Sequence, residues 1–210
     1  SMVIVLKALK LNESNRVLYN SIKGIEDKNA IHIRIEKDWR NYGLKKKFRI
    51  IDIQTLINMY KSQFKREIFF TTGENQENVK KEFLKHNIDS VYFFNKSIEY
   101  EINAAINFEI CCNAKKFIGL TQSTFSNLIS LKRCLNNRKE CYIYDNFKNI
   151  TKRIDKGLHC SPKLASENRV SFTSGIIEKN NEDNNLFNVV YFCCMISEWK
   201  IVCKNNADTL

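Results

Sequence analysis

The sequence predicts an α/β protein with a doubly wound parallel sheet, followed by a small C-terminal β appendage. From about residue 8 to 150, short apolar segments alternate with segments of helical periodicity. Strands separated by helices run parallel, because the right-handed crossover is nearly obligatory. The 210 residues are 43% hydrophobic and include one Pro and six Gly, a composition that favours a globular chain over a disordered one.

Each element of this repeat has a local signal. Gly24 is expected to close the first helix, and Asp52 is expected to cap the second, whose apolar residues recur at i, i+3, i+4 and i+7. In the first strand, alternation places Ile31, Ile33 and Ile35 on one face. Helices are predicted over residues 8–23, from 52 onward, 75–86, 100–113 and 123–135, and strands over 30–35, 67–72, 90–94, 116–119 and 141–144.

The repeat ends near residue 150, which divides the chain into a domain of residues 1–150 and a second part of residues 151–210. Residues 152–168 contain the only Pro and are predicted to form a connection. Residues 169–177, 186–195 and 199–204 have the composition of strands, and a turn-rich segment separates the first two. The second part is therefore predicted to be a β-rich appendage.

The formal net charge of +11 raises the question of nucleic-acid binding. Lys outnumbers Arg by 25 to 9, whereas phosphate and base recognition favour the bidentate Arg side chain. The dense basic run at residues 45–49 has no interleaved aromatic ladder. We therefore interpret the charge as a solvated basic surface and predict no nucleic-acid partner. No membrane partner is predicted either, since no apolar run approaches the roughly 18 residues of a span.

The eight cysteines include no C-x-x-C pair, so they do not indicate a metal site. Adjacent pairs, such as Cys111-Cys112, lie in apolar stretches and favour buried free thiols. The alternative is a secretory chain in which some of residues 134, 141, 160 and 203 form disulfides. The opening Ser1-Met2 resembles a cloning remnant, which leaves open the removal of a targeting segment or upstream domain, and leaves the localisation, secretory or cytoplasmic, undecided.

Polar residues follow three of the predicted strands, where ligands of open parallel sheets bind. Arg34 and Glu36 continue the first strand on the face opposite its isoleucines, and Thr72 ends the second. Gly119 ends the fourth, where a glycine lets the backbone approach a ligand, and Ser123 opens the next helix. Helix-opening hydroxyls and N–H groups suit an anion, and the alternative is that Ser123 is only an N-cap.

These segments resemble motifs of the GDP-fucose-dependent fucosyltransferases, most closely the protein O-fucosyltransferases. The pattern His32-x-Arg34-x-x-x-Asp38-Trp39 resembles their first motif. Residues 107–126, NFEICCNAKKFIGLTQSTFS, are similar to their last motif, in which an Asp ten residues before Phe-Ile-Gly is followed by a Ser/Thr-Phe-Ser/Thr turn. Residues 69–72, FFTT, lie where the family has its middle motif, and the resemblance covers about residues 28–135.

The resemblance implies one half of a GT-B fold, in which two Rossmann-like domains face each other and the C-terminal one holds most of the donor. Residues 1–150 would be this nucleotide-sugar-binding domain. Arg34 would hold the sugar diphosphate and stabilise charge on the leaving phosphate, work that a metal does in other glycosyltransferases. The alternative for Arg34 is a surface salt bridge with Glu36 or Asp38. The substrate-binding residues implied in addition are His32, Asp38, Thr72, Ser123, Thr124 and Phe125.

The chain departs from the family pattern in two ways. Asn107 stands where the family has an Asp that accepts two hydrogen bonds from guanine, and the exchange of an acceptor for a donor costs about 1–3 kcal/mol with an unchanged base. Asn107 remains a predicted substrate-binding residue, although guanine selectivity is in question. Only about 25 residues precede the first strand, whereas a full enzyme of the family has an acceptor-binding N-terminal domain, so we expect either a donor-binding domain cut from a longer chain or a short divergent protein.

The function predicted from the resemblance is inverting, metal-independent transfer of fucose from GDP-fucose to a hydroxyl of a protein or glycan acceptor. Arg34 would be the catalytic residue, with no cofactor and no metal ligands. The sequence does not identify the general base, since Glu36, Asp38 and Glu74, the carboxylates at strand ends, are better interpreted as solvated or salt-bridged surface acids. Two alternatives stay open: a glycosyltransferase that uses another nucleotide sugar, and a non-catalytic nucleotide-sugar-binding module.

Overall fold

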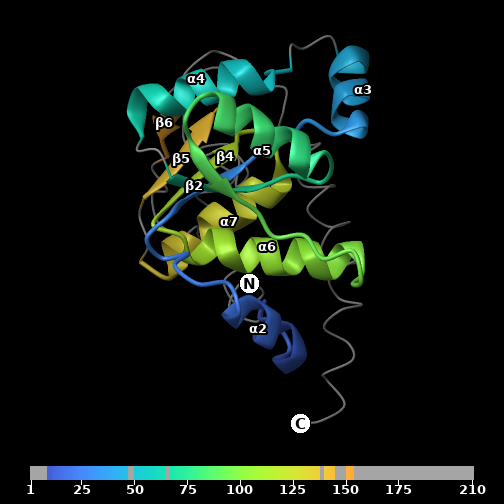
Figure 1. The fold of residues 1–210 in the computed structure, drawn as a ribbon, viewed down its shortest axis with the longest axis vertical. Helices are drawn as coiled ribbons and strands as arrows, with labels where there is room; N and C mark the ends of the chain where they lie inside the picture. Colours follow the sequence, from blue (N-terminus) through green and yellow to red (C-terminus); the bar gives the residue numbers. More distant parts are fainter. Residues whose placement is uncertain (1–8, 47–49, 65–66, 138–139, 145–149, 154–210) are drawn as a thin grey trace, which may run out of the picture.

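A six-stranded sheet lies between two layers of helices in the computed structural model of this chain (Figure 1). The structure describes residues 9–46, 50–64, 67–137, 140–144 and 150–153. The predicted β appendage, including Cys160 and Cys203, lies outside these residues. The α/β fold class is confirmed, and the arrangement is Rossmann-like.

The strands follow the order β3-β2-β1-β4-β5-β6, and the first five run parallel. Their bounds are β1 Asn29–His32, β2 Glu67–Thr71, β3 Asp89–Val91, β4 Lys116–Leu120, β5 Cys141–Tyr144 and β6 Ile150–Lys152. The sequence predicted the five parallel strands to within three residues but missed β6, which pairs antiparallel with β5. Lys152, predicted to open a connection, is instead the last residue of this edge strand.

The helices agree with the predictions except at the start of the chain and after β1. They are α2 Glu13–Asn20, α3 Lys37–Lys46, α4 Ile53–Gln63, α5 Gln76–Lys85, α6 Tyr100–Asn113 and α7 Thr124–Leu135. Asp52 caps α4 as predicted, because its carboxylate accepts a hydrogen bond from Thr55 N at 2.8 Å. The first helix is shorter than predicted, since the Asn12 side chain caps it by accepting from Asn15 N, and Gly24, with φ +71°, lies beyond its end. Helix α3 was not predicted.

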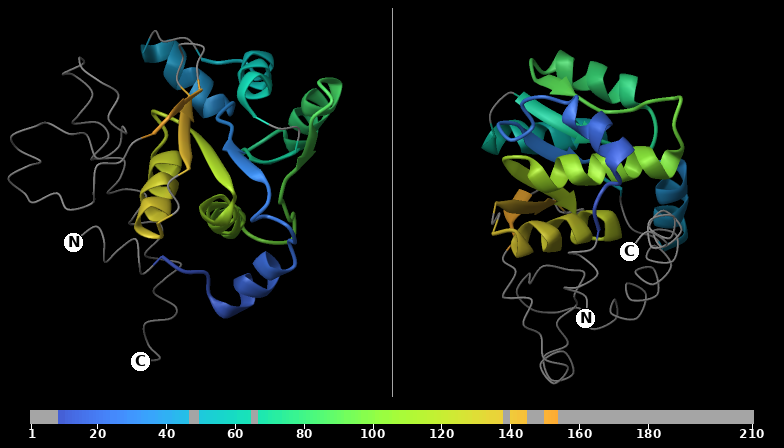
Figure 2. Two further views of the ribbon diagram at one scale, coloured as in Figure 1. Left: turned by 90° about the vertical axis from the view of Figure 1, so that its left-hand side faces the viewer. Right: turned by 90° about the horizontal axis from the view of Figure 1, so that it is seen from below.

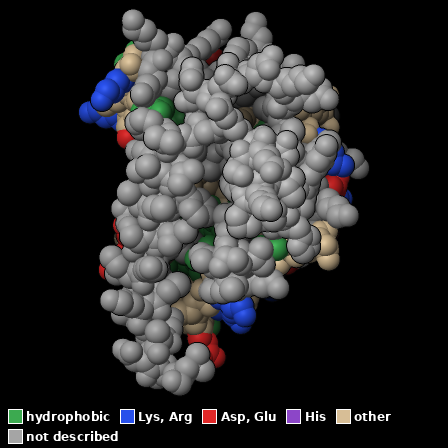
Figure 3. Space-filling model, turned by 180° about the vertical axis from the view of Figure 1, so that it is seen from behind, with side chains coloured by type: hydrophobic (Ala, Val, Ile, Leu, Met, Phe, Trp, Pro, Cys, Tyr) green, Lys and Arg blue, Asp and Glu red, His purple; other side chains and the backbone are tan. Residues whose placement is uncertain are grey.

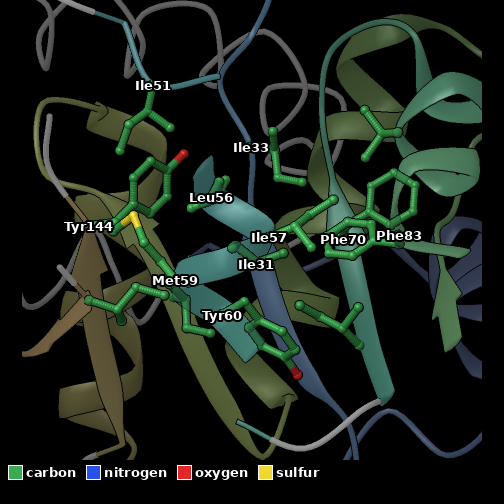
Figure 4. Packing of buried hydrophobic residues seen from close by; sticks show 14 of the residues in the cluster. Ile31, Ile33, Ile51, Leu56, Ile57, Met59, Tyr60, Phe70, Phe83 and Tyr144 are labelled. Carbon is green, nitrogen blue, oxygen red and sulfur yellow. The ribbon is translucent and has the colours of Figure 1, made fainter. Parts of the chain in front are cut away.

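Two apolar cores fill the space on either side of the sheet. The first joins the sheet to α4 and α5, and Figure 4 shows Ile57 and Tyr60 packed over Ile31, with Phe70 and Phe83 beside them. The second joins the other face to α6 and α7, and α2 packs on α6 below it (Figure 2). Ile31 and Ile33 are buried in the first core and Ile35 packs against it, as alternation predicted.

A buried arginine closes the end of α6. Arg133, on α7, is fully buried and donates to the carbonyl oxygens of Cys111, Cys112 and Ala114 at 2.6–3.0 Å. These carbonyls lie at the C-terminus of α6, where the helix dipole is negative, so the helix itself balances part of the charge. Cys111 and Cys112 are buried free thiols, as predicted, and burial raises the pKa of both.

Candidate functional site

The order in which the chain adds strands reverses between β1 and β4, which are parallel neighbours. Open α/β sheets form ligand crevices at such a position. Chain connections lead from β1 to β2 and β3 on one side, and from β4 to β5 on the other. The carboxyl end of β1 continues into Arg34 and Glu36, and that of β4 leads to the N-terminus of α7. The two predicted motifs therefore flank one edge of the sheet.

Arg34 is fixed by two carboxylates at this edge. Its Nη2 donates to Asp38 Oδ2 at 2.7 Å, and its Nε lies 3.5 Å from Glu36 Oε2. The guanidinium carbon lies 5.6 Å from the centroid of the Trp39 ring. The salt bridges that the sequence offered as the alternative for Arg34 are thus formed. Of the five N–H donors of the guanidinium, one forms a hydrogen bond, to Asp38. The Arg34 side chain is 30% exposed, so its other N–H groups are available to bind an anion.

Glu36 links the ends of β1 and β2. Its Oε1 accepts a hydrogen bond from Gly73 N at 2.6 Å, while its Oε2 is buried and has the Arg34 ion pair as its polar contact. A Cβ at residue 73 would lie only 2.8 Å from Glu36 Oε1, so a side chain there would displace this carboxylate. This carboxylate is therefore part of the support that holds Arg34 in place.

His32, predicted to line the nucleotide end of the cleft, is instead 5% exposed and bonded within the fold. Its Nδ1 lies 2.8 Å from the hydroxyl of Ser126, which also accepts from Leu120 N at 3.0 Å. Burial, and secondarily the charge of Arg34, lower the pKa of His32 to about 3, so the imidazole is neutral at neutral pH. His32 thus ties β1 to α7 and β4.

Gly119 has a different role from the one predicted. A Cβ there would lie 2.6 Å from Cβ of Ser126, so the glycine makes room for this buried serine and not for a ligand. Close approach of α7 to β4 is the physical requirement. The sequence contained the signal, a Gly seven residues before a Ser on the next helix, but did not indicate which partner fills the space.

The N-terminus of α7 is capped as its sequence indicates. The Ser123 hydroxyl accepts from Ser126 N at 3.4 Å, and the first intrahelical bond runs from Asn127 N to Ser123 O. The N–H groups of Thr124 and Phe125 precede that bond and therefore have no acceptor within the helix, as at any helix N-terminus. The ring of Phe125 packs at 4.9 Å from the His32 ring, which gives this residue a packing role in the second core.

Two other predicted substrate-binding residues are held inside the fold. Asn107 is 7% exposed, and its Nδ2 donates to the carbonyl oxygens of Asn103 at 2.8 Å and Phe93 at 3.1 Å. The buried amide ties α6 to the segment after β3, whereas the motif resemblance predicts a position at the nucleobase. Thr72 is also buried, and its hydroxyl donates to Glu74 O at 3.2 Å within the loop before α5.

Sequence reasoning missed Tyr100, the first residue of α6. Its hydroxyl lies 3.2 Å from the position of a Cβ on Gly73, beside Glu36. Burial of the hydroxyl and the carboxylate of Glu36 raise the pKa of Tyr100, and the charge of Arg34 opposes them. The only signal in the sequence was an aromatic residue at the start of a helix, which usually indicates packing.

A cavity of about 420 Å³ lies beside this cluster, between the segment that leads into α4 and the start of α5. Half of its lining residues are apolar, four of them isoleucines, and the other half are polar or charged: Ile35, Arg40, Ile50, Ile51, Asp52, Ile53, Asn75, Asn78, Val79 and Glu82. Arg34 and the α7 N-terminus do not line it. The cavity is therefore a separate feature of the same edge of the sheet.

Charge on the described surface is mixed. In the view of Figure 3, the described Lys and Arg side chains form separate groups with acidic side chains nearby. Within the described ranges, no group of three or more His, Cys, Asp and Glu residues could hold a metal ion. Nor does any helix there combine the length and the hydropathy that crossing a bilayer requires.

Comparison of the chain with models of known protein families and with curated proteins finds no match. The class that the structure supports is therefore set by the sheet and its connections: a Rossmann-like α/β protein. At the carboxyl edge of β1, this sheet carries an arginine, Arg34, that is held by two carboxylates and remains partly exposed.

Proposed function

We propose that this chain binds the diphosphate of a nucleotide sugar at the carboxyl ends of β1 and β4 and transfers the sugar to a hydroxyl of a protein or glycan. GDP-fucose is the donor that the motif resemblance favours. The observation that carries the proposal is Arg34, which is held by Asp38 and Glu36 at the edge where Rossmann-like sheets bind ligands and is 30% exposed. A preorganised guanidinium is suited to a diphosphate, since it offers two parallel N–H donors.

The proposed reaction is a displacement at the anomeric carbon. The acceptor oxygen bonds to that carbon, and the bond from the carbon to the phosphate oxygen breaks with its electron pair left on the nucleoside diphosphate. The acceptor proton passes to water or buffer. Arg34 would stabilise the charge that develops on the departing phosphate, and its fixed position avoids reorganisation at that moment. Glu36 and Asp38 would then act as positioning residues for Arg34.

A donor with another base is the second candidate, because of Asn107. Its amide nitrogen faces two carbonyl oxygens, and both of its donors are directed at the backbone. The residue is also buried, so it offers no accessible edge to guanine. The base of the nucleotide sugar is therefore not specified by the residue that the motif resemblance assigned to it.

The test is isothermal titration calorimetry with GDP, GDP-fucose, UDP and ADP, without added metal. We expect the wild-type chain to bind at least one of these, and Arg34→Ala to weaken that binding at least tenfold, equivalent to about 1.4 kcal/mol. Arg34→Lys keeps the charge but loses the fork, so it should recover only a small part. Arg16→Ala, an exposed arginine on α2, is the matched control and should bind like wild type.

Release of free nucleoside diphosphate from the preferred donor, in the presence of hydroxyl acceptors, then tests transfer. No binding of any nucleotide would refute the proposal, and unchanged binding by Arg34→Ala would show that Arg34 is only a salt-bridged surface residue. Tighter binding of UDP or ADP than of GDP would select the second candidate.

A further inference from the structure

Tyr100 is oriented against the usual preference of a tyrosine. Its residue surface is 59% exposed, yet its hydroxyl lies in the polar cluster at the ends of β1 and β2, near Gly73 and Glu36. A surface tyrosine normally buries its ring and leaves the hydroxyl in water. Here the hydroxyl lies in the cluster, so the exposed surface of the residue is mainly its apolar ring, at the open edge of the sheet.

The hydroxyl of Tyr100 lies among the groups that surround Gly73. Gly73 has no side chain, and the tyrosine hydroxyl and Glu36 Oε1 lie 3.2 Å and 2.8 Å from where its Cβ would be. Glu36 also pairs with Arg34, so the same carboxylate lies near both the phenol and the guanidinium. The backbone of Tyr100 is in turn fixed by the first turn of α6. An exposed aromatic face close to a fixed cation is the combination found where a flat, anionic ligand binds.

We propose that the ring of Tyr100 is the stacking platform for the nucleobase of the nucleotide whose diphosphate Arg34 binds. The inference rests on the proposed function and adds the residue that holds the base. A nucleobase follows its diphosphate by a single ribose, so a platform next to the arginine is within reach of it. Stacking on an aromatic side chain tolerates every base, since each has a π face. This agrees with the buried position of Asn107, which keeps the side chain that the motif resemblance assigned to the base away from the surface.

Calorimetry with GDP and inorganic pyrophosphate separates the platform from the anion site. Tyr100→Ala and Tyr100→Leu both remove the aromatic face and should weaken GDP binding tenfold or more, while pyrophosphate binding stays within twofold of wild type. Tyr100→Phe keeps the ring and should stay within threefold of wild type for both ligands. Leu84→Ala removes an equally exposed apolar side chain at the far end of α5 and should change neither. Circular dichroism verifies that each variant is folded.

Three results would overturn the platform while leaving the diphosphate site in place. They are unchanged GDP binding by Tyr100→Ala, an equal loss in Tyr100→Phe and Tyr100→Ala, and wild-type binding of GDP no tighter than that of pyrophosphate. A loss seen with GDP-fucose but not with GDP would assign the ring to the sugar and also overturn it. Absence of all binding to the wild-type chain would instead refute the proposed function, and the platform with it.

Discussion

Replacing Asn107 with Asp tests whether this residue supports the fold or faces a ligand. In the structure Asn107 Nδ2 donates to Asn103 O at 2.8 Å and to Phe93 O at 3.1 Å. An Asp places an oxygen against both carbonyl oxygens, so two hydrogen bonds are lost, each with a net contribution of about 1 kcal/mol. The buried carboxylate adds a repulsive and desolvation cost. We therefore expect Asn107→Asp to lower the free energy of unfolding by about 2–4 kcal/mol at pH 7.

Urea denaturation followed by circular dichroism measures this loss, at pH 7 and again at pH 5. The new carboxyl should have a raised pKa in the folded state, so the folded variant binds more protons and its deficit shrinks as the pH falls. Asn41→Asp, an exposed change on α3, is the matched control and should shift stability by less than about 0.5 kcal/mol. A variant with wild-type stability and tighter GDP binding would refute the reasoning, because the side chain would then face the ligand.

The other two predictions concern two buried basic residues, His32 and Arg133. Because the pKa of His32 is about 3 in the folded protein and 6.5 without the fold, the unfolded chain binds the extra proton, and stability falls as the pH drops below 6.5. The free energy of unfolding should be about 2 kcal/mol lower at pH 5 for this reason, and His32→Gln should remove this part of its pH dependence. Urea titrations at several pH values measure it, and the same dependence of the free energy of unfolding on pH in both proteins would contradict the prediction. Arg133→Met should lower the free energy of unfolding by at least about 3 kcal/mol, since it leaves carbonyls at the end of α6 without donors. Thermal unfolding measures that effect, and an unchanged midpoint would show that water replaces the guanidinium.

Much of the fold could be predicted because its signals are local. The Asp52 and Ser123 caps, together with helical periodicity, mark the starts of α4 and α7, and alternation marks β1. Helix α3 escaped prediction because it is mostly polar and contains Gly43, so it has no clear apolar stripe. Strand β6 is three residues long and depends on pairing with β5, which no local pattern encodes.

The candidate site was only partly predictable, for the same reason. The sequence indicated that Arg34 and the start of α7 lie at strand ends, and the strand order brings β1 and β4 together. It did not indicate that His32 and Asn107 turn inward, or that Tyr100 joins the cluster from α6. Each of these depends on contacts between residues far apart in the chain.

By itself, the sequence determined the alternation of strands and helices, and with it a parallel α/β sheet, because capping and hydrophobic periodicity act between neighbours. The tertiary structure decided which polar side chains reach the open edge. Arg34 remains half-exposed between two carboxylates, while the histidine and the asparagine of the same motifs satisfy buried hydrogen bonds. A side chain at a strand end can face solvent or the core, and only the packing of distant elements determines which of the two costs less free energy.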